Sequence, residues 1–576
     1  MFKSLTLKNF RNFENIYIEL KDKNIILGMN DVGKSNLLHS LRMIFDRKIR
    51  LDEIHSSDFH NKNMGSAIEI IVGLDISHFD GDDVEKLIAK VQEARTQEES
   101  QNFYIKLKID NKEDEGALKQ FYWGDDLDNL REIKAKGINY LVLDDVFSVV
   151  YIPSHVETVR VFNDIRKEIL KDIEEVEHDF ILKNEINENF QKINEKIQEL
   201  TTVCKIEEVI NTNLKVFDDA YKVTITSQSV VDDLYKQLKI YTIESDHDHL
   251  YPASGDGRQK KIMYAMLHYF LEKEAIKKIP ILILEEPENH LFLSAQIDLS
   301  RTLFDDLNIK YIFCSSHSSE LLYHIGIDCN LVRLYRQKNM PLRKTISSSA
   351  QISSEYHNLK KMYAEGLSKG YFADCVLLVE GYSEKLLCDS ILSCVLSKNQ
   401  FQKLYVLPVL GTNFKPYRDL LKKLGIKIIV RTDNDIYKND IYGLKRCLKI
   451  VNKNLTEIIP EELKGRKDEG EIILNKKKKD LHKHFQPLIE NLKLEHDIFL
   501  AEIDLENDIV NALLDEGISD CSLSGEVVDL EELKSELQYK KWHNMFLFLE
   551  ENEELFEIIF KNSRFDFLKE VKACLV

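Results

Sequence analysis

The sequence predicts an α/β protein with a nucleotide-binding domain at the N-terminus and a metal-binding domain at the C-terminus. A glycine-rich loop at residues 28–35 lies between a short apolar run and a pattern typical of a helix. In the C-terminal third, the apolar runs 376–379 and 426–430 are each followed by acidic residues. Such apolar strands are typical of parallel sheets that helices cover on both faces.

Length and composition limit the class of protein. A chain of 576 residues is too long for a single core, so we expect two or three domains. The net charge of −19 argues against a protein that coats nucleic acid, although bound metal ions allow an acidic enzyme to act on it. No apolar run is long enough to span a membrane, and the start lacks the layout of a signal peptide. Nine scattered cysteines at no metal-binding spacing fit a reducing compartment, so we expect a cytoplasmic protein without membrane association.

Apolar periodicity places the glycine-rich loop within a series of strands and helices. Alternation predicts strands at residues 5–10 and 16–20, and a short apolar run predicts a buried strand at 25–27. Spacings of three and four predict a helix over residues 36–45, directly after the loop. Further strands are predicted at residues 68–74, 103–109, 281–284, 311–316 and 404–409.

The character of the chain changes between residues 156 and 240. Charged residues dominate there, and apolar residues recur at three and four, which predicts a helical insertion that could act as a dimerisation arm. The predicted order is nucleotide-binding domain, first part (1–155), helical insertion (156–240), second part (241–345), linker (346–372) and metal-binding domain (373–576).

Residues 28–35 match the phosphate-loop pattern GxxxxGK[ST]. The backbone of such a loop, here including Asn30 and Gly33, holds phosphate oxygens together with the N-terminus of the following helix. Lys34 is placed to reach the terminal phosphates, and Ser35 to ligate magnesium. We therefore expect this loop to bind ATP with Mg²⁺.

Later segments suit the same nucleotide. The apolar strand at 281–284 ends in Glu285, which could hold magnesium through water, and Glu286, which could orient an attacking water. A strand at 311–316 is followed by His317, which could sense the γ-phosphate. A glycine-rich segment that opens a helix also suits phosphate. Its candidate residues are Ser254, Gly255 and Gly257.

This order of motifs resembles the ABC-type ATPases of chromosome maintenance and DNA repair, over about residues 1–345. In that class the Ser-Gly segment completes the nucleotide site of the opposite subunit, so the resemblance implies a homodimer or a larger assembly, such as a tetramer. Asp58 stands where that class has its magnesium and water-sensing loop. Glu285 departs from the usual aspartate, and a longer carboxylate there could slow or abolish hydrolysis without preventing binding.

Acidic residues follow two predicted strands of the C-terminal domain. Glu380 ends one strand, and Glu384 lies one turn into the next helix, so the two can face the same point. Asp433 and Asp435 follow the strand at 426–430 and share a face at period two. Carboxyl ends of parallel strands converge on one edge, where four acids would repel each other unless cations lie between them. Oxygen-only ligation favours Mg²⁺, Mn²⁺ or Ca²⁺, and two such ions are a common device for phosphodiester cleavage.

The pattern Leu378-Val379-Glu380-Gly381, Gly411 and Asp433-x-Asp435 resembles the Toprim fold of topoisomerases, primases and certain nucleases. An ABC-type ATPase followed by Toprim is the layout of the OLD (overcoming lysogenization defect) family. The details are most similar to the nucleases of Gabija anti-phage systems. The shared motifs are GMND and GK in the phosphate loop, SGDGR at 254–258, EEPE at 285–288, SHS at 316–318, TDND at 432–435 and EIDLEND at 502–508.

This resemblance implies a metal-dependent endonuclease that acts on double-stranded DNA and works with a superfamily-1-type helicase. The implied metal site adds acids of the 502–508 segment to those above, and Lys541 stabilises the transition-state phosphate. The implied ligands are Glu380, Glu384, Asp433, Asp435, Asp504, Glu506 and Asp508. The nucleotide is expected to regulate the nuclease, in an inhibitory direction.

Two other functions remain open from the sequence. A topoisomerase-like transesterase would use the same Toprim acids, but it needs a nucleophilic tyrosine on a helix-turn-helix domain, and the sequence contains no block that reads as one. An ATP-driven DNA clamp would use Toprim only as a scaffold, which gives no reason for a set of mutually repelling carboxylates.

Overall fold

The computed structural model describes residues 1–77, 82–91, 100–112, 116–134, 141–154, 177–214, 224–225, 241–244, 247–252, 262–264, 266–267, 271, 275–289, 291–306, 309–322, 324–325, 329–336, 345–352, 366–434, 442–452, 461–464, 466 and 468–575. These residues divide into two compact units, one formed by residues 1–154 and 277–576 and the other by residues 155–276. The helical insertion was predicted to begin at residue 156, and the second unit begins at residue 155. The predicted insertion ended at residue 240, whereas the second unit ends at residue 276.

Two six-stranded sheets form the N-terminal part of the first unit. The antiparallel sheet has the order β2-β1-β4-β5-β6-β7, and the other, mostly parallel, has the order β14-β13-β3-β12-β11-β8. The first contains β1 (Phe2–Phe10), β2 (Phe13–Glu19), β4 (Ile68–Asp75), β5 (Asn102–Lys112), β6 (Gly116–Gly124) and β7 (Arg131–Glu132). The second contains β3 (Lys23–Leu27), β8 (Phe147–Ile152), β11 (Ile279–Glu285), β12 (Tyr311–Ser316), β13 (Cys329–Arg336) and β14 (Thr345–Gln351). Every strand predicted in this part is confirmed.

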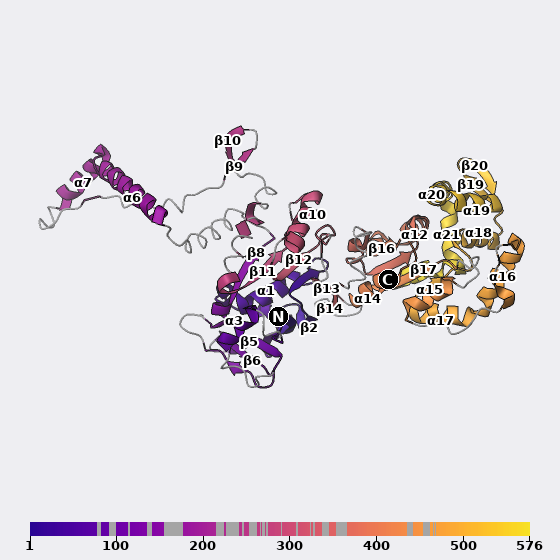
Figure 1. The fold of residues 1–576 in the computed structure, drawn as a ribbon, viewed down its shortest axis with the longest axis horizontal. Coiled ribbons are helices and arrows are strands. Elements are labelled where there is room, and N and C mark those ends of the chain that lie inside the picture. Colours follow the sequence, from indigo (N-terminus) through magenta and orange to yellow (C-terminus); the bar gives the residue numbers. More distant parts are fainter. Residues whose placement is uncertain are drawn as a thin grey trace. The chain divides into compact units, whose positions relative to one another are not determined.

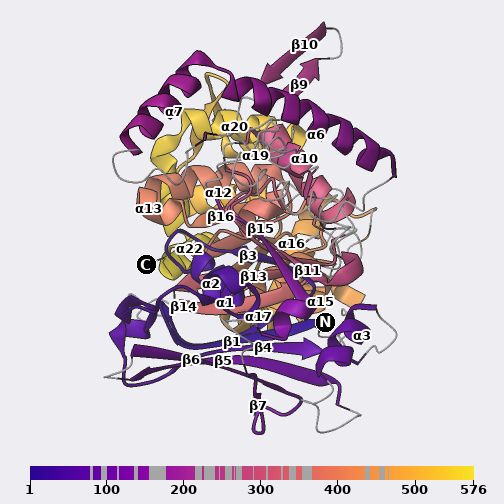
Figure 2. The same cartoon turned by 90° about the vertical axis from the view of Figure 1, so that its left-hand side faces the viewer.

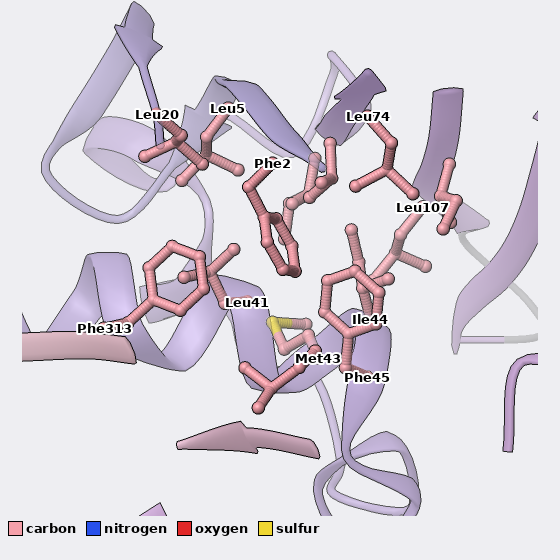
Figure 3. Packing of buried hydrophobic residues seen from close by; sticks show 14 of the residues in the cluster. Phe2, Leu5, Leu20, Leu41, Met43, Ile44, Phe45, Leu74, Leu107 and Phe313 are labelled. Atoms are coloured by element: carbon pink, nitrogen blue, oxygen red, sulfur yellow. The ribbon is translucent and has the colours of Figure 1, made fainter. Parts of the chain in front are cut away.

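Helix α1 (Lys34–Phe45) follows the glycine-rich loop and packs its apolar face into the core beside the antiparallel sheet (Figure 2). Figure 3 shows Phe2 of β1 between Phe313 of β12 and Phe45 of α1, with ring centroids 5.0 Å and 5.9 Å apart. Burying a side chain of this size stabilises the fold by roughly 1.5–3 kcal/mol. This packing fixes the loop at the start of α1. Shorter helices of this part are α2 (Arg47–Arg50), α3 (Asp82–Val91), α4 (Leu143–Val146) and α10 (Leu293–Arg301).

Strand β14 occupies the start of the predicted linker. It pairs antiparallel with β13, so the sheet extends to Gln351 although the sequence predicted a linker from residue 346. Its central residues Ser347, Ser348 and Ser349 are polar and half-buried because β14 is an edge strand with only part of its surface covered. A polar edge strand lacks the apolar alternation from which strands are predicted.

The C-terminal part is built on a four-stranded parallel sheet of order β16-β15-β17-β18. Its strands are β15 (Cys375–Val379), β16 (Leu404–Pro408), β17 (Lys427–Thr432) and β18 (Ile498–Leu500). The helices around it are α12 (Tyr382–Val395), α13 (Lys398–Phe401), α14 (Lys415–Lys423), α15 (Tyr442–Ile450), α16 (Glu471–His484), α17 (Gln486–His496), α18 (Leu505–Asp515), α19 (Leu530–Tyr539), α20 (Lys541–Glu551), α21 (Phe556–Lys561) and α22 (Asp566–Leu575). A hairpin of β19 (Asp520–Leu523) and β20 (Glu526–Asp529) completes this part (Figure 1). The strands predicted from apolar runs are confirmed.

The second unit contains helices α6 (Glu177–Gln198) and α7 (Thr201–Leu214) and a hairpin of β9 (Tyr241–Glu244) and β10 (His247–Pro252). The helical prediction is confirmed over residues 177–214. Ile186 and Ile193 of α6 and Leu200 beyond its end are exposed, and the role of this unit as a dimerisation arm stays a prediction. Among the described residues, no helix is both long and apolar enough to cross a membrane.

Candidate nucleotide and metal sites

The glycine-rich loop joins β3 to α1 in a conformation that requires its glycines. Gly28 and Gly33 have φ values of 154° and 103°. A Cβ atom on Gly28 would lie 2.5 Å from the Leu334 carbonyl oxygen, and one on Gly33 would lie 2.1 Å from Asn12 Nδ2. No side chain caps the N-terminus of α1, so its first amides remain available to an anion.

Lys34 folds back over its own loop. Its ammonium donates to the carbonyl oxygens of Gly28 and Met29 at 3.1 Å and 3.2 Å and lies 2.5 Å from His317 Nε2. Burial lowers the pKa of Lys34, and the nearby Glu286 carboxylate opposes this shift. A negatively charged phosphate bound by the loop would therefore contact the desolvated ammonium group of Lys34. Asn30 and Ser35 are exposed on the same loop.

The acids after β11 meet the loop at the end of the parallel sheet. Glu286 Oε1 lies 2.9 Å from His317 Nε2 and 3.9 Å from Lys34 Nζ. Glu286 has a φ of 43°, a left-handed conformation that is uncommon for glutamate and is often associated with functional sites. The sequence prediction that Lys34, Glu286 and His317 share one site is thus supported by their geometry.

Two contacts here had no counterpart in the sequence analysis. The hydroxyl of Tyr151 donates to Glu285 Oε2 at 2.5 Å, and the Arg42 guanidinium stacks 3.5 Å from the Tyr151 ring centre. Burial and the neighbouring Glu285 carboxylate raise the pKa of Tyr151, so it remains a donor. Tyr151 comes from β8, more than a hundred positions before its partner, so no local pattern indicated the pair.

Glu288 also supports this site, in addition to Tyr151 and Arg42, and was not among the predicted site residues. Its Oε1 accepts hydrogen bonds from Ser316 Oγ at 2.8 Å and from the amides of His317 and Ser318 at 2.7 Å and 3.2 Å. Burial raises the pKa of Glu288, and these donors oppose the shift. Glu288 therefore positions the loop that carries His317. The EEPE motif at 285–288 marks this segment in the sequence, but roles were predicted only for its first two acids, Glu285 and Glu286.

Of the two remaining predicted parts of the nucleotide site, Asp58 lies among the described residues and the Ser-Gly segment does not. Asp58 is buried, and its Oδ1 accepts from Arg11 Nε at 2.9 Å, while Nη1 of the same arginine donates to Asn36 Oδ1 of α1 at 2.8 Å. The Ser-Gly segment lies outside the described residues, so its position stays a prediction. That segment contains Ser254, Gly255 and Gly257.

The acids of the C-terminal domain gather at the carboxyl ends of β15 and β17, which pair in parallel. Glu380 follows β15, and its Oε1 accepts from Thr432 Oγ1 at 2.5 Å and from the Asp433 amide at 2.9 Å. The Arg446 guanidinium of α15 donates to the same oxygen. Glu384 caps the start of α12 through the Gly381 amide at 3.0 Å. The expected convergence of strand ends is therefore present for these residues.

Arg431 lies at the centre of this group and was not predicted as a site residue. Its side chain is only 2% exposed. One nitrogen lies 2.6 Å from Asp433 Oδ1 and 3.7 Å from Glu384 Oε1, and another donates to Asp508 Oδ2 at 3.2 Å. A buried cation is costly unless it is paired, and here the surrounding carboxylates pair it. Arg431 directly precedes the TDND motif, and this position is its one mark in the sequence.

Helix α18 brings the acids of the 502–508 segment to the same group. Asp504 caps the helix by accepting from the Asn507 amide at 2.8 Å, and Glu506 and Asp508 are buried in its first turn. Burial raises the pKa of Glu506, with Asp504 adding to the shift, and burial raises the pKa of Asp508 to about 7. Asp508 Oδ1 has no hydrogen-bond partner among the described residues.

Lys541 begins α20 and is exposed. Burial raises the pKa of Glu506, and the charge of Lys541 opposes this rise. Gln538 Nε2, three residues before Lys541, lies 3.4 Å from Asp504 Oδ2. The corner between α19 and α20 thus adjoins the first turn of α18. The predicted neighbourhood of Lys541 and the acids is therefore supported.

These residues fit a divalent cation. Burial raises the pKa of Asp433 strongly, Arg431 opposes the shift, and the charges of Glu380, Glu384 and Glu506 add to it. A cation among the acids would relieve this repulsion and would satisfy the orphaned oxygen of Asp508. Within the described residues, however, no three acidic, histidine or cysteine side chains are already arranged around one ion position. Asp435 lies outside the described residues.

Comparisons with known proteins agree with both parts. Residues 1–322 match the model of the AAA ATPase domain, and residues 371–435 match that of the overcoming lysogenization defect protein-like TOPRIM domain. The chain is 37% identical over 529 residues to endonuclease GajA of Bacillus cereus (strain VD045), covering 89% of this chain and 90% of that protein.

Among solved structures, the chain matches the SMC head domain from Thermotoga maritima, at 13% identity and a TM-score of 0.32. The match covers 61% of this chain and 99% of that chain. The chain also matches the SmcHead bound to the C-winged helix domain of ScpA, at 13% identity and a TM-score of 0.35, over 62% of this chain and 98% of that chain. The relative and the two matched domains show that the chain belongs to the OLD family of ATPase–Toprim proteins, with endonuclease GajA among its members.

Proposed function

We propose that this protein is a metal-dependent DNA endonuclease of anti-phage defence, regulated by nucleotide. The observation that carries the proposal is the meeting of Glu380, Asp433 and the buried Arg431 at the carboxyl end of a parallel sheet. A scaffold would gain nothing from buried acids that repel one another. The relationship to a protein named as an endonuclease supports the same activity.

The proposed ligands of Mg²⁺ or Mn²⁺ are all carboxylates: Glu380, Glu384, Asp433, Asp435, Asp504, Glu506 and Asp508. Divalent cations held by such residues activate water and stabilise the leaving oxygen of a phosphodiester. Arg431 holds Asp433 and Asp508 at a fixed separation, and Lys541 stabilises negative charge on the phosphate of double-stranded DNA. Glu380, Asp433, Asp435 and Lys541 are the proposed catalytic residues of cleavage.

In the N-terminal domain, ATP is proposed to bind the loop residues Asn30, Gly33, Lys34 and Ser35. Glu285 would hold the magnesium ion and Glu286 would orient water, while His317 would contact the γ-phosphate. Ser254, Gly255 and Gly257 would complete the site of a second subunit. We infer that ATP binding inhibits cleavage, since an unregulated nuclease would damage the host. A preference of about 3 kcal/mol for an inactive ATP-bound state changes the active population by roughly a hundredfold.

The proposed assembly is a homodimer or tetramer that acts with a superfamily-1-type helicase, as the family resemblance implies. The proposed compartment is the reducing cytoplasm, which suits nine cysteines scattered along the sequence at no metal-binding spacing. Native mass measurement of the purified protein would determine the number of subunits.

A plasmid assay tests the proposed activity. Supercoiled plasmid is incubated with the protein and Mg²⁺, with and without ATP, and the products are separated by electrophoresis. Nicked or linear DNA is the expected product, with less of it when ATP is present. Closed circles of altered linking number would mean a topoisomerase, and unchanged plasmid under all conditions would favour a DNA clamp.

A further inference from the structure

Three aromatic side chains at the corner between α19 and α20 are exposed to solvent. Tyr539, Trp542 and Phe546 have exposed fractions of 77%, 61% and 49%. Trp542 and Phe546 lie four residues apart on α20 and therefore share one face of that helix. The buried side of α20 is already filled by Met545 and Phe548, so the exposed rings are not needed by the core. We name these three residues the aromatic platform.

Positive charge lies next to the aromatic platform. Lys540 and Lys541 occupy the N-cap and first position of α20, and the Lys540 ammonium lies 6.0 Å from the Tyr539 ring centre. The neighbouring helices begin differently, because α18 and α19 have aspartate N-caps and acidic first turns. Acidic residues stabilise a helix N-terminus and lysines oppose it, so helix stability does not explain the two lysines.

The aromatic platform adjoins the acids of the proposed nuclease site. Helix α19 contacts both α18 and α20, which Figure 1 shows together at the C-terminal end of the colour scale. Gln538, directly before Tyr539, reaches Asp504 at 3.4 Å. The aromatic platform therefore lies on helices that pack against the helix carrying Asp504, Glu506 and Asp508.

We propose that the aromatic platform stacks unpaired bases of the DNA strand whose phosphates Lys540 and Lys541 contact. The inference rests on the proposed nuclease function and adds a substrate preference to it. Flat rings beside lysines are the combination that binds single-stranded nucleic acid, because rings stack on bases while cations follow the backbone. Bases inside a duplex have their faces covered by neighbours. The enzyme should thus favour DNA with unpaired bases beside the cleavage position.

The chain offers a direct probe, since it contains only two tryptophans. Trp123 is buried in β6 with 9% exposure, so a Trp123→Phe variant leaves Trp542 as the single fluorophore. This variant is titrated in EDTA, which prevents cleavage, with an oligo(dT) strand and with a blunt duplex of equal length. Binding is followed in parallel by anisotropy of labelled DNA. We expect strong quenching of Trp542 by the single strand and weak quenching by an equal amount of bound duplex.

Affinity measurements provide the second arm. Trp542→Ala should weaken oligo(dT) binding about tenfold, whereas Trp542→Phe, which retains a ring, should retain most of the affinity. Tyr17→Ala is the matched control, because Tyr17 is 59% exposed on β2 in the N-terminal domain. Equal affinities of the Trp542→Ala variant and the wild type, or equal quenching by duplex and single strand, would overturn the proposal.

A third outcome would assign the surface to another partner. If iodide fails to quench Trp542 without DNA, and Trp542→Ala lowers the native mass, the aromatic platform is a contact between copies of the chain and the proposal is wrong. Failure of the nuclease function gives a different result, namely no nicking of plasmid by the wild-type protein. If the wild type nicks plasmid normally and Trp542→Ala binds oligo(dT) as tightly as the wild type, the nuclease function stands and only the stacking of bases on the aromatic platform is overturned.

Discussion

Arg431 Nη1 lies 2.6 Å from Asp433 Oδ1, so a buried guanidinium occupies the centre of the carboxylates that the sequence assigned to metal ions. Its other nitrogen reaches Asp508, a residue 77 positions away in the chain. Arg431, itself a residue of β17, therefore joins Asp433, which directly follows that strand, to Asp508 of α18. The charge of the guanidinium reduces their repulsion and allows the domain to fold with its acids already close together.

Replacing Arg431 with methionine should destabilise the C-terminal domain by about 3–5 kcal/mol, since the change leaves buried acids without their cation. Added Mg²⁺ should restore part of this loss, because a bound cation supplies the missing charge. Thermal unfolding with and without Mg²⁺ measures both effects. Arg418→Met is the control, because Arg418 is a buried arginine of α14 that contacts the His496 carbonyl oxygen. An equal response of the two variants to Mg²⁺ would contradict this role of Arg431.

Glu380→Ala and Asp433→Ala should each abolish DNA cleavage and leave ATP binding unchanged, because both acids lie in the Toprim domain, far along the chain from Lys34. Nicking assays at saturating Mg²⁺ and nucleotide-binding titrations measure the two properties. Asp389→Ala provides the control, since Asp389 pairs with Lys385 on α12 outside the acidic group. If both variants nick plasmid at the wild-type rate, the metal-site assignment is incorrect.

Lys541→Ala should reduce the cleavage rate by about a hundredfold or more, which is typical for the loss of one group that stabilises transition-state charge. Metal affinity should stay near the wild-type value, because an ammonium group cannot ligate a cation. Nicking rates and Mn²⁺ titrations followed by electron paramagnetic resonance would separate the two effects. Lys534→Ala, on the neighbouring α19, is the control and should cleave normally. Loss of Mn²⁺ binding in Lys541→Ala would indicate a structural lysine instead.

Lys34→Ala should remove inhibition by ATP while the nuclease stays active, since Lys34 is the buried cation of the phosphate loop. The nicking rate is measured against ATP concentration at fixed free Mg²⁺, so that chelation of the metal cannot imitate inhibition. The wild-type rate should fall with ATP and the variant rate should not. A flat wild-type curve, or identical curves for both proteins, would refute regulation through this site.

His39 of α1 should make the N-terminal domain less stable in mild acid. Burial, together with the nearby Arg11 and Arg42, lowers the pKa of His39 from 6.5 to about 4. The folded state therefore binds fewer protons than the unfolded state, so this stability is complete above pH 6.5 and is lost as the pH falls toward 4. Between pH 7.5 and 5.5 the loss is about 1 kcal/mol, and His39→Asn should abolish it.

The measurement for His39 is thermal unfolding of both proteins at the two pH values without nucleotide. The melting temperature of the wild type should fall further than that of the variant on acidification. A fall of the same size in both proteins would show that other groups control the acid sensitivity.

The sequence by itself determined the strands and helices that carry the motifs, but not the polar edge strand β14. Apolar alternation and three-four spacing are local properties, and burial of one face enforces them in the fold, so β1, β3, α1, β15 and β17 were predicted from their own residues. The placement of Lys34, Glu286 and His317 in one site also followed, because loops at the carboxyl ends of parallel strands meet at one edge.

Only the tertiary structure decided which side chains support these sites. The contacts of Tyr151 with Glu285, of Glu288 with the His317 loop and of Arg431 with Asp508 each join residues 29 to 134 positions apart. No periodicity marks such partners, because their chemistry depends on burial and on hydrogen-bond geometry that arise when the sheets pack. In the sequence, an arginine or a tyrosine within an apolar strand only interrupts the apolar pattern. It becomes part of a site when the packing of the sheets places a carboxylate beside it.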